Sequence, residues 1–179
     1  MEAHSEGKGC GARFVVRLPL SGAPAAVPEL EPQGTLTDAR ADFLPALQGL
    51  HVLVVDDEPD ARDLVVSILE DCQVTVSKAA SVTEAMAAFD RATPDVLVSD
   101  IGIPGQTGYD LIRQVRARSA QRGGQTPAVA VTAYARATDR TQALRAGFNM
   151  HMAKPIDPVE LIVTVATLAG RISRLKTAP

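Results

Sequence analysis

The chain has 179 residues, and its 18 basic and 21 acidic side chains give a net charge of -3. This length is enough for one domain with a sizeable core plus additional segments, and so balanced a charge argues against a nucleic-acid or membrane surface. Aromatic residues make up 3% of the chain and tryptophan is absent, which argues against aromatic platforms for base stacking.

Cysteine usage and hydropathy indicate the compartment. Cys10 and Cys72 lie far apart and belong to no Cys-x-x-Cys pair, which fits a reducing cytoplasm and provides neither a disulfide framework nor a zinc site. No apolar stretch reaches the roughly 18 residues of a membrane helix, and the polar start is unlike a signal peptide. We therefore expect a cytoplasmic protein whose chain makes no membrane contact.

The first 48 residues are predicted to contain little regular structure. Phe14, Val16 and Leu18 recur at every second position, as the buried side of a short strand does. Residues 21–48 are rich in Ala, Pro and Gly and lack a sustained period. They indicate a linker with one short helix near Asp38–Leu47.

From residue 49 to Gly170, strand and helix patterns alternate and predict five β-α units. The strands are expected at short apolar runs, namely Leu53–Val55, Val74–Val76, Val96–Val98, Val129–Val131 and Met150–Ala153. The helices are expected at amphipathic segments, namely Ala61–Leu69, Val82–Phe89, Leu111–Val115, Arg136–Ala146 and Asp157–Leu168. Ser81 and Glu84 predict a capping box, and Gly147 predicts a helix end.

Polar residues follow four of these strands. They are Asp56-Asp57-Glu58, Ser99-Asp100, Thr132 and Lys154-Pro155. Because the carboxyl ends of parallel strands meet at one edge of a sheet, the pattern predicts a crevice with three aspartates, a hydroxyl and an ammonium group. Packed carboxylates repel each other, and a hard divalent cation such as Mg²⁺ relieves that repulsion through oxygen ligands.

The same crevice has the parts of a phosphoryl-transfer site. Asp100 can act as a carboxylate nucleophile that becomes an aspartyl phosphate. Lys154 and the metal would neutralise charge on the equatorial oxygens of the transferred group, and Thr132 offers one of them a hydroxyl.

These motifs, in this order over Leu50 to Gly170, resemble the receiver domain of two-component response regulators. They are Val54-Val55-Asp56-Asp57-Glu58, Val98-Ser99-Asp100, Val131-Thr132-Ala133 and Lys154-Pro155. The resemblance implies an α/β, doubly wound, flavodoxin-like fold with a five-stranded parallel sheet of order 2-1-3-4-5.

The resemblance also implies a role for each site residue. Asp100 would be the phosphoacceptor, assisted by Lys154 and Thr132. The metal ligands would be Asp56, Asp57, Asp100 and the backbone carbonyl of Gly102. Thr132 and His151 would form a conformational switch, while Gly102 and Tyr134 would tune the lifetime of the phosphate. Pro155 would follow a cis peptide bond that aims Lys154 into the site.

Partners follow from the same resemblance. The phosphoryl group would come from a phosphohistidine of a sensor histidine kinase or a histidine phosphotransfer protein. The chain would catalyse only its own phosphorylation and dephosphorylation, and another protein would recognise a surface that changes on phosphorylation. Only nine residues follow Gly170, too few for a DNA-binding output domain, so we expect the signal to leave through a protein partner.

Two enzyme classes are alternatives. A haloacid-dehalogenase-like phosphatase or phosphotransferase also uses an aspartate nucleophile and Mg²⁺, but it needs an Asp-x-Asp motif where this chain has Asp100-Ile101-Gly102. A dinucleotide-dependent enzyme needs Gly-x-Gly-x-x-Gly after its first strand, which this chain lacks.

The first twenty residues resemble the end of a histidine-kinase ATP-binding domain, in which a glycine-rich box leads into a strand that closes on Leu18-Pro19. The alternative is a glycine turn before an unrelated strand. If the resemblance holds, the chain is the C-terminal receiver of a hybrid sensor histidine kinase. The domains would then be the remnant at 1–20, a linker at 21–48, the receiver at 49–171 and a tail at 172–179.

Overall fold

The computed structural model describes residues 2–4, 13–15, 43–133 and 137–171. The chain divides into two compact units, Met1–Gln33 and Gly34–Pro179. In the first unit, β1 (Glu2–His4) pairs antiparallel with β2 (Arg13–Val15). The strand predicted around Phe14 is therefore present over three residues. The rest of the expected ATP-binding remnant lies outside the described residues, so its origin stays a prediction.

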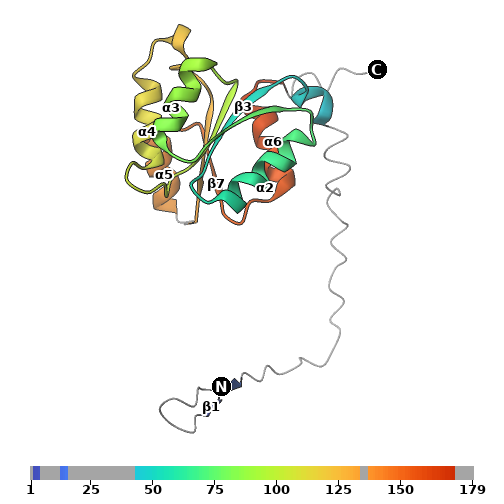
Figure 1. Ribbon diagram of the computed structural model, residues 1–179, viewed down its shortest axis with the longest axis vertical. Helices are drawn as coiled ribbons and strands as arrows, with labels where there is room; N and C mark the ends of the chain where they lie inside the picture. Colours follow the sequence, from blue (N-terminus) through green and yellow to red (C-terminus); the bar gives the residue numbers. More distant parts are fainter. Residues whose placement is uncertain (1, 5–12, 16–42, 134–136, 172–179) are drawn as a thin grey trace. The chain divides into compact units, whose positions relative to one another are not determined.

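The second unit is built on one parallel five-stranded sheet (Figure 1). Its strands in chain order are β3 (His51–Val55), β4 (Thr75–Ala79), β5 (Val96–Asp100), β6 (Ala128–Thr132) and β7 (Met150–Ala153). The spatial order is β4-β3-β5-β6-β7, which confirms the predicted order 2-1-3-4-5. Every residue of β5 and β6 is buried, as expected for central strands that are covered on both faces.

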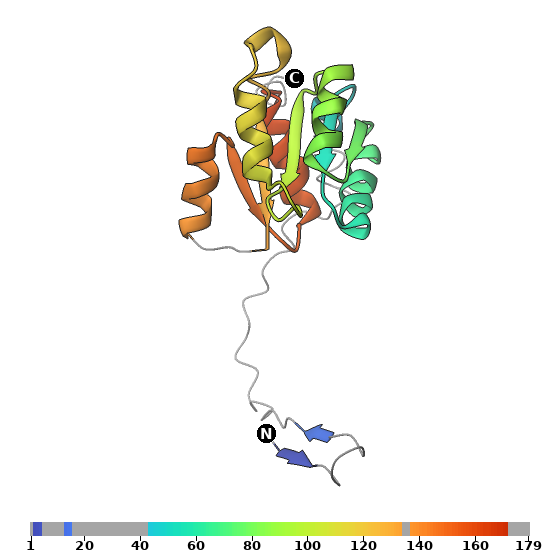
Figure 2. The ribbon, with the colours of Figure 1, turned by 60° about the vertical axis from the view of Figure 1, so that its left-hand side comes forward.

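Helices cover both faces of this sheet. They are α2 (Pro59–Glu70), α3 (Val82–Arg91), α4 (Gly108–Arg116), α5 (Ala137–Ala146) and α6 (Pro158–Leu168), with the short 3-10 helix η1 (Ala120–Arg122) after α4. Helices α2 and α6 pack on one face, and α3, α4 and α5 pack on the other (Figures 1 and 2). No described helix is both long enough and apolar enough to span a bilayer.

Two apolar cores result from the alternation of side chains along the strands. Val52 and Val54 face α2 and α6, whereas Leu53 and Val55 face the helices on the other side. The first core also includes the helical residues 43–47, where Leu47 is fully buried. This stretch is part of the short helix expected near Asp38–Leu47, and residues 38–42 lie outside the described residues.

The helix caps differ in part from the sequence prediction. The Ser81 side chain accepts a hydrogen bond from Glu84 N, which is one of the two bonds of the predicted capping box. The second bond is not formed, because the Glu84 carboxylate accepts from Ala80 N and not from Ser81 N. A complete capping box forms instead between Thr107 and Asp110 at the start of α4.

Three other local predictions can be compared directly. Asp157 caps α6 as expected, by accepting from Glu160 N at 2.9 Å. Gly147 ends α5 with a φ of 119°, a conformation that favours glycine. The strand predicted at Val74–Val76 begins one residue later and extends to Ala79, because the edge strand β4 includes polar residues that interrupt the apolar run.

Candidate functional site

The predicted polar residues do meet at the carboxyl edge of the sheet. Asp56 follows β3, Asp100 ends β5, Thr132 ends β6 and Lys154 follows β7. The parallel register places Asp100 beside Val131. The order of the strands thus brings together residues that are up to 98 positions apart in the chain.

Three carboxylates form the acidic part of the site. One oxygen each from Asp56, Asp57 and Asp100 lies within 4.8 Å of the others. Asp56 and Asp100 are 4% and 8% exposed, whereas Asp57 is exposed. Backbone groups fix the buried pair, because Glu58 N donates to Asp56 Oδ1 at 3.0 Å and Gly102 N donates to Asp100 Oδ1 at 3.1 Å.

Lys154 provides the positive charge of the site. Its Nζ donates to Asp56 Oδ2 at 2.8 Å and to Asp100 Oδ2 at 3.1 Å. Burial acts to lower the pKa of Lys154, but hydrogen bonds and charge attraction from the two aspartates outweigh it and raise the pKa. The ammonium group therefore stays charged at neutral pH and offsets part of the carboxylate repulsion.

The backbone around Lys154 sets its direction. The peptide bond between Lys154 and Pro155 is cis, as the resemblance implied, and Lys154 N donates to Thr132 O at 2.8 Å. Thr132 itself is 6% exposed. The ends of β6 and β7 are thereby held together next to the buried aspartates.

Gly102 lies directly over the Asp100 carboxylate. A Cβ built on Gly102 would be 3.5 Å from Asp100 Oδ2, an ordinary contact distance. Gly102 itself is exposed, so no side chain covers the carboxylate from this position.

His151 is the predicted switch residue on β7. His151 pairs with Ala130 across the β6–β7 register and is half-buried. Its Nε2 atom is buried and has no hydrogen-bond partner among the described residues. Tyr134 lies outside the described residues, so its proposed effect on phosphate lifetime stays a prediction.

Arg62 is a site neighbour that the sequence analysis missed. Its Nη1 donates to the backbone oxygen of Asp56 at 2.6 Å and so fixes the end of β3 from helix α2. The only signal was a basic residue on the first turns of an amphipathic helix, which is an ordinary surface pattern.

A model of the response regulator receiver domain family matches residues 52–166. The chain therefore belongs to the family of response regulator receiver domains, the signalling modules of two-component systems. Among the helices and strands of the second unit, the match runs from β3 to α6 and omits only His51 of β3, the last two residues of α6 and, before the sheet, the helical residues 43–47. The haloacid-dehalogenase alternative is not favoured, because fold, motifs and family all agree on the receiver.

Individual relatives extend this finding. An uncharacterized 14.6 kDa protein in the sodA1 3' region of Leptolyngbya boryana is 47% identical over 116 residues, which cover 65% of this chain and 87% of that protein. The transcriptional regulatory protein TrcR of Mycobacterium tuberculosis is 36% identical over 137 residues, or 76% of this chain and 50% of TrcR. The chain therefore spans about half the length of TrcR.

A solved structure of another receiver domain resembles the fold of this chain. The receiver domain of the sensor histidine kinase PA1611 from Pseudomonas aeruginosa PAO1 has a TM-score of 0.62 and 30% sequence identity, and the match covers 68% of this chain and 98% of that one. The crystal structure of that domain has a magnesium ion coordinated in its active-site cleft.

Proposed function

We propose that this receiver takes a phosphoryl group from a phosphohistidine onto Asp100. The observation that supports this most directly is the position of the Asp100 carboxylate, which is buried at a strand end, fixed by Gly102 N and paired with Lys154. The Asp100 carboxylate is thus held in one position, and the neighbouring Gly102 is exposed and has no side chain that a donor would have to displace.

The oxygen ligands of the site fit Mg²⁺. Asp56, Asp57 and Asp100 offer three carboxylate oxygens within 4.8 Å of one another, and hard cations prefer carboxylate and carbonyl oxygens. These three residues would hold the ion, with the backbone carbonyl of Gly102 as a further ligand. When bound, the ion would supply positive charge for the phosphoryl oxygens and relieve the repulsion among the carboxylates.

The transfer itself needs one bond formed and one broken. A carboxylate oxygen of Asp100 attacks phosphorus in line with the P–N bond of the phosphohistidine, which breaks and leaves a neutral imidazole after protonation. Lys154 contacts the attacking carboxylate before the reaction and can follow the charge onto the phosphoryl oxygens. Thr132, at the end of the adjacent strand, would donate its hydroxyl to one of these oxygens.

The donor would be a sensor histidine kinase or a histidine phosphotransfer protein in the cytoplasm. Beyond its own phosphorylation and dephosphorylation, the receiver would catalyse no reaction. Its signal would pass to a protein partner, with Thr132 and His151 as the residues whose positions report on the phosphate. The view that the chain is part of a hybrid histidine kinase rests on the sequence resemblance of residues 1–20.

The test is Asp100→Asn, which keeps the volume of the side chain and removes the nucleophile. Incubation with acetyl phosphate and Mg²⁺ should add one phosphoryl group to the unmodified protein by intact mass and none to the variant. Asp95→Asn is the matched control, because it makes the same change before the first residue of the same strand, at the opposite edge of the sheet. Persistent labelling of Asp100→Asn at another residue would contradict the assignment.

A further inference from the structure

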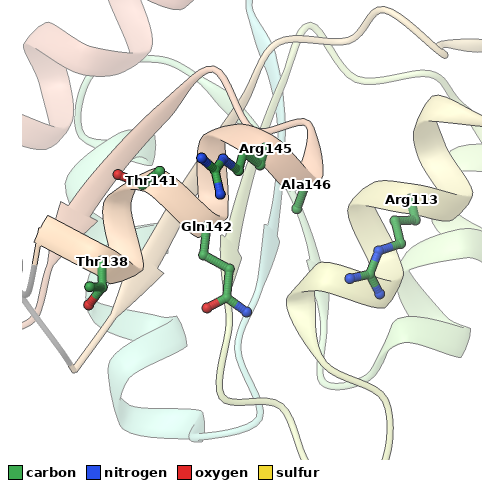
Figure 3. Close-up of a pocket in the computed structure, with 6 residues that line it drawn as sticks. All are labelled: Arg113, Thr138, Thr141, Gln142, Arg145 and Ala146. Atoms are coloured by element: carbon green, nitrogen blue, oxygen red, sulfur yellow. The ribbon is translucent and has the colours of Figure 1, made fainter.

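A groove of about 680 Å³ runs between helices α4 and α5, on the face of the sheet that these two helices cover (Figure 3). Its lining consists of polar and basic side chains together with one alanine, namely Arg113, Thr138, Thr141, Gln142, Arg145 and Ala146. These residues differ from the candidate site residues at the strand ends, so the groove is a separate feature of the surface.

One wall of the groove is a continuous stripe of α5. Thr138, Thr141, Gln142 and Arg145 follow the i, i+3, i+4, i+7 spacing that places side chains on one helix face. Figure 3 shows their side chains projecting from this helix, and all four are exposed. A helix face that packs against another helix usually carries apolar residues. The polar and basic side chains of this stripe therefore indicate that it does not pack tightly against α4.

The opposite wall contributes Arg113 from α4. Its Nη1 donates to Asp110 Oδ1 at 3.1 Å, and this pair is exposed. The Asp110 carboxylate is already held by Thr107, whose hydrogen bonds are the main reason that its pKa is lowered. A guanidinium group has five N–H donors, so Arg113 keeps donors for another carboxylate.

The charges of the groove are unbalanced. Arg113 and Arg145 are its charged lining residues, and no carboxylate is among the described residues that line it. Arg145 makes no hydrogen bond or ion pair with the described residues. Asp110 offsets part of the charge of Arg113, whereas Arg145 has no such partner among the described residues, so the groove keeps an excess of positive charge in a chain with a net charge of -3. Such a local positive surface favours an anionic partner.

We propose that the α4–α5 groove binds an acidic segment of a partner protein, with carboxylates of that segment on Arg113 and Arg145. The two guanidinium groups extend from different helices (Figure 3). Charges on two walls suit carboxylates spaced along a peptide, whereas a small anion such as phosphate needs donors that converge on one point. Ala146 provides an apolar contact, and the Thr138 hydroxyl and the Gln142 amide provide hydrogen-bond partners for a peptide backbone.

Titration with a short acetylated peptide of alternating Glu and Leu residues, followed by ¹H–¹⁵N NMR of the full chain, tests the proposal. We expect shift changes concentrated on the groove residues of α4 and α5, and a loss of affinity as the salt concentration rises. Arg113→Ala and Arg145→Ala should each weaken binding about two- to fivefold, the range for exposed charge pairs. Arg140→Ala is the matched control, because Arg140 is an exposed arginine of α5 outside the groove.

Several results would overturn the proposal. One is no binding, or shift changes spread over other faces. Another is equal weakening by Arg140→Ala, which would indicate attraction to the general charge of α5. Equal binding of inorganic phosphate at the same residues would indicate a small-anion site, and shifts that depend on protein concentration alone would indicate a second copy of the chain. Because the experiment uses unphosphorylated protein, its failure would leave the role of Asp100 unaffected.

Discussion

The three aspartates of the candidate site differ in how their charges are offset. Asp56 and Asp100 share the ammonium group of Lys154, whereas Asp57 is exposed and has no ion-pair partner among the described residues. Asp57 therefore adds negative charge to the cluster without a matching positive charge. Such an arrangement favours cation binding over stability of the metal-free fold.

From this we predict opposite effects for Asp57→Ala. Without Mg²⁺, the free energy of unfolding should rise by up to about 1 kcal/mol, because one repulsive charge is removed. The affinity for Mg²⁺ should fall, because one carboxylate ligand is lost. Urea denaturation and calorimetric Mg²⁺ titration measure the two quantities.

Glu58→Ala is the matched control for this change, because it removes an adjacent exposed carboxylate that is outside the cluster. Unchanged Mg²⁺ affinity in Asp57→Ala, or an equal loss in both variants, would show that the cluster does not hold the ion.

A further residue-scale prediction concerns Lys154→Met, which keeps most of the aliphatic chain and removes the charge. At neutral pH the variant should be less stable by about 1 to 3 kcal/mol, because two buried carboxylates lose a charged partner. The pKa of Lys154 is raised in the folded protein. Its contribution to the free energy of unfolding is therefore complete below the pKa of lysine in the unfolded chain, about 10.4, and is lost as the pH rises through the higher pKa of the folded protein.

The measurement is urea denaturation of both proteins between about pH 7 and pH 11. The stability difference should stay constant up to about pH 10 and shrink above it. A difference that already vanishes between pH 7 and pH 9 would contradict the account of Lys154 as a charged partner of Asp56 and Asp100.

At the scale of elements, helix α4 depends on its N-terminal cap. Thr107 N and Thr107 Oγ1 both donate to Asp110 Oδ2, at 2.9 and 2.8 Å, while Asp110 N donates to Thr107 Oγ1 at 3.4 Å. This cap follows the loop after Asp100, and Gly108 N donates to Ile101 O at 3.1 Å. The cap thus fixes the path of the chain between the candidate phosphoacceptor and α4.

Thr107→Ala should therefore lower the free energy of unfolding by about 1 kcal/mol, the usual contribution of an N-cap hydroxyl. Ser119→Ala is the control, because Ser119 precedes η1 and forms no side-chain cap, so it should change stability by less than about 0.5 kcal/mol. Chemical denaturation of the two variants checks the difference. Equal destabilisation would mean that the Thr107 hydroxyl is not what stabilises the start of α4.

The elements also show which features the sequence could predict. Four strand ends followed from apolar runs that stop at polar residues, because a parallel sheet imposes one burial pattern on every central strand. The order of the strands followed only from the resemblance to receiver domains, because apolar runs do not specify which strands pair. The end of β4 was missed, since an edge strand tolerates polar residues such as Lys78. The contact from Arg62 to Asp56 O was missed for another reason. It depends on the distance between a helix and a strand end, which no local pattern encodes.

At the scale of the whole molecule, the helical residues 43–47 belong to the core of the second unit. Ala46 and Leu47 are 2% and 0% exposed and contact the core on the side of α2 and α6. The far end of the unit joins this region, because Arg171 Nη1 donates to Gln48 O at 3.0 Å. We therefore expect residues 43–47 to stabilise the receiver, although none of the proposed site residues lies there.

Two truncations separate these contributions. Removal of residues 1–33, at the boundary between the two compact units, should leave the stability of the receiver and the phosphorylation of Asp100 nearly unchanged. Removal of residues 1–47 should lower the free energy of unfolding by about 3 kcal/mol or more, because it deletes the buried Leu47 and exposes the side chains beneath it. Phosphorylation should persist in the fraction that is folded, since every proposed site residue follows the cut.

Urea denaturation monitored by circular dichroism, together with intact mass after acetyl phosphate treatment, measures both effects. Equal stability of the two truncated proteins would show that residues 43–47 do not contribute to the core, and loss of labelling in a folded protein without residues 1–33 would show that the N-terminal segment completes the site.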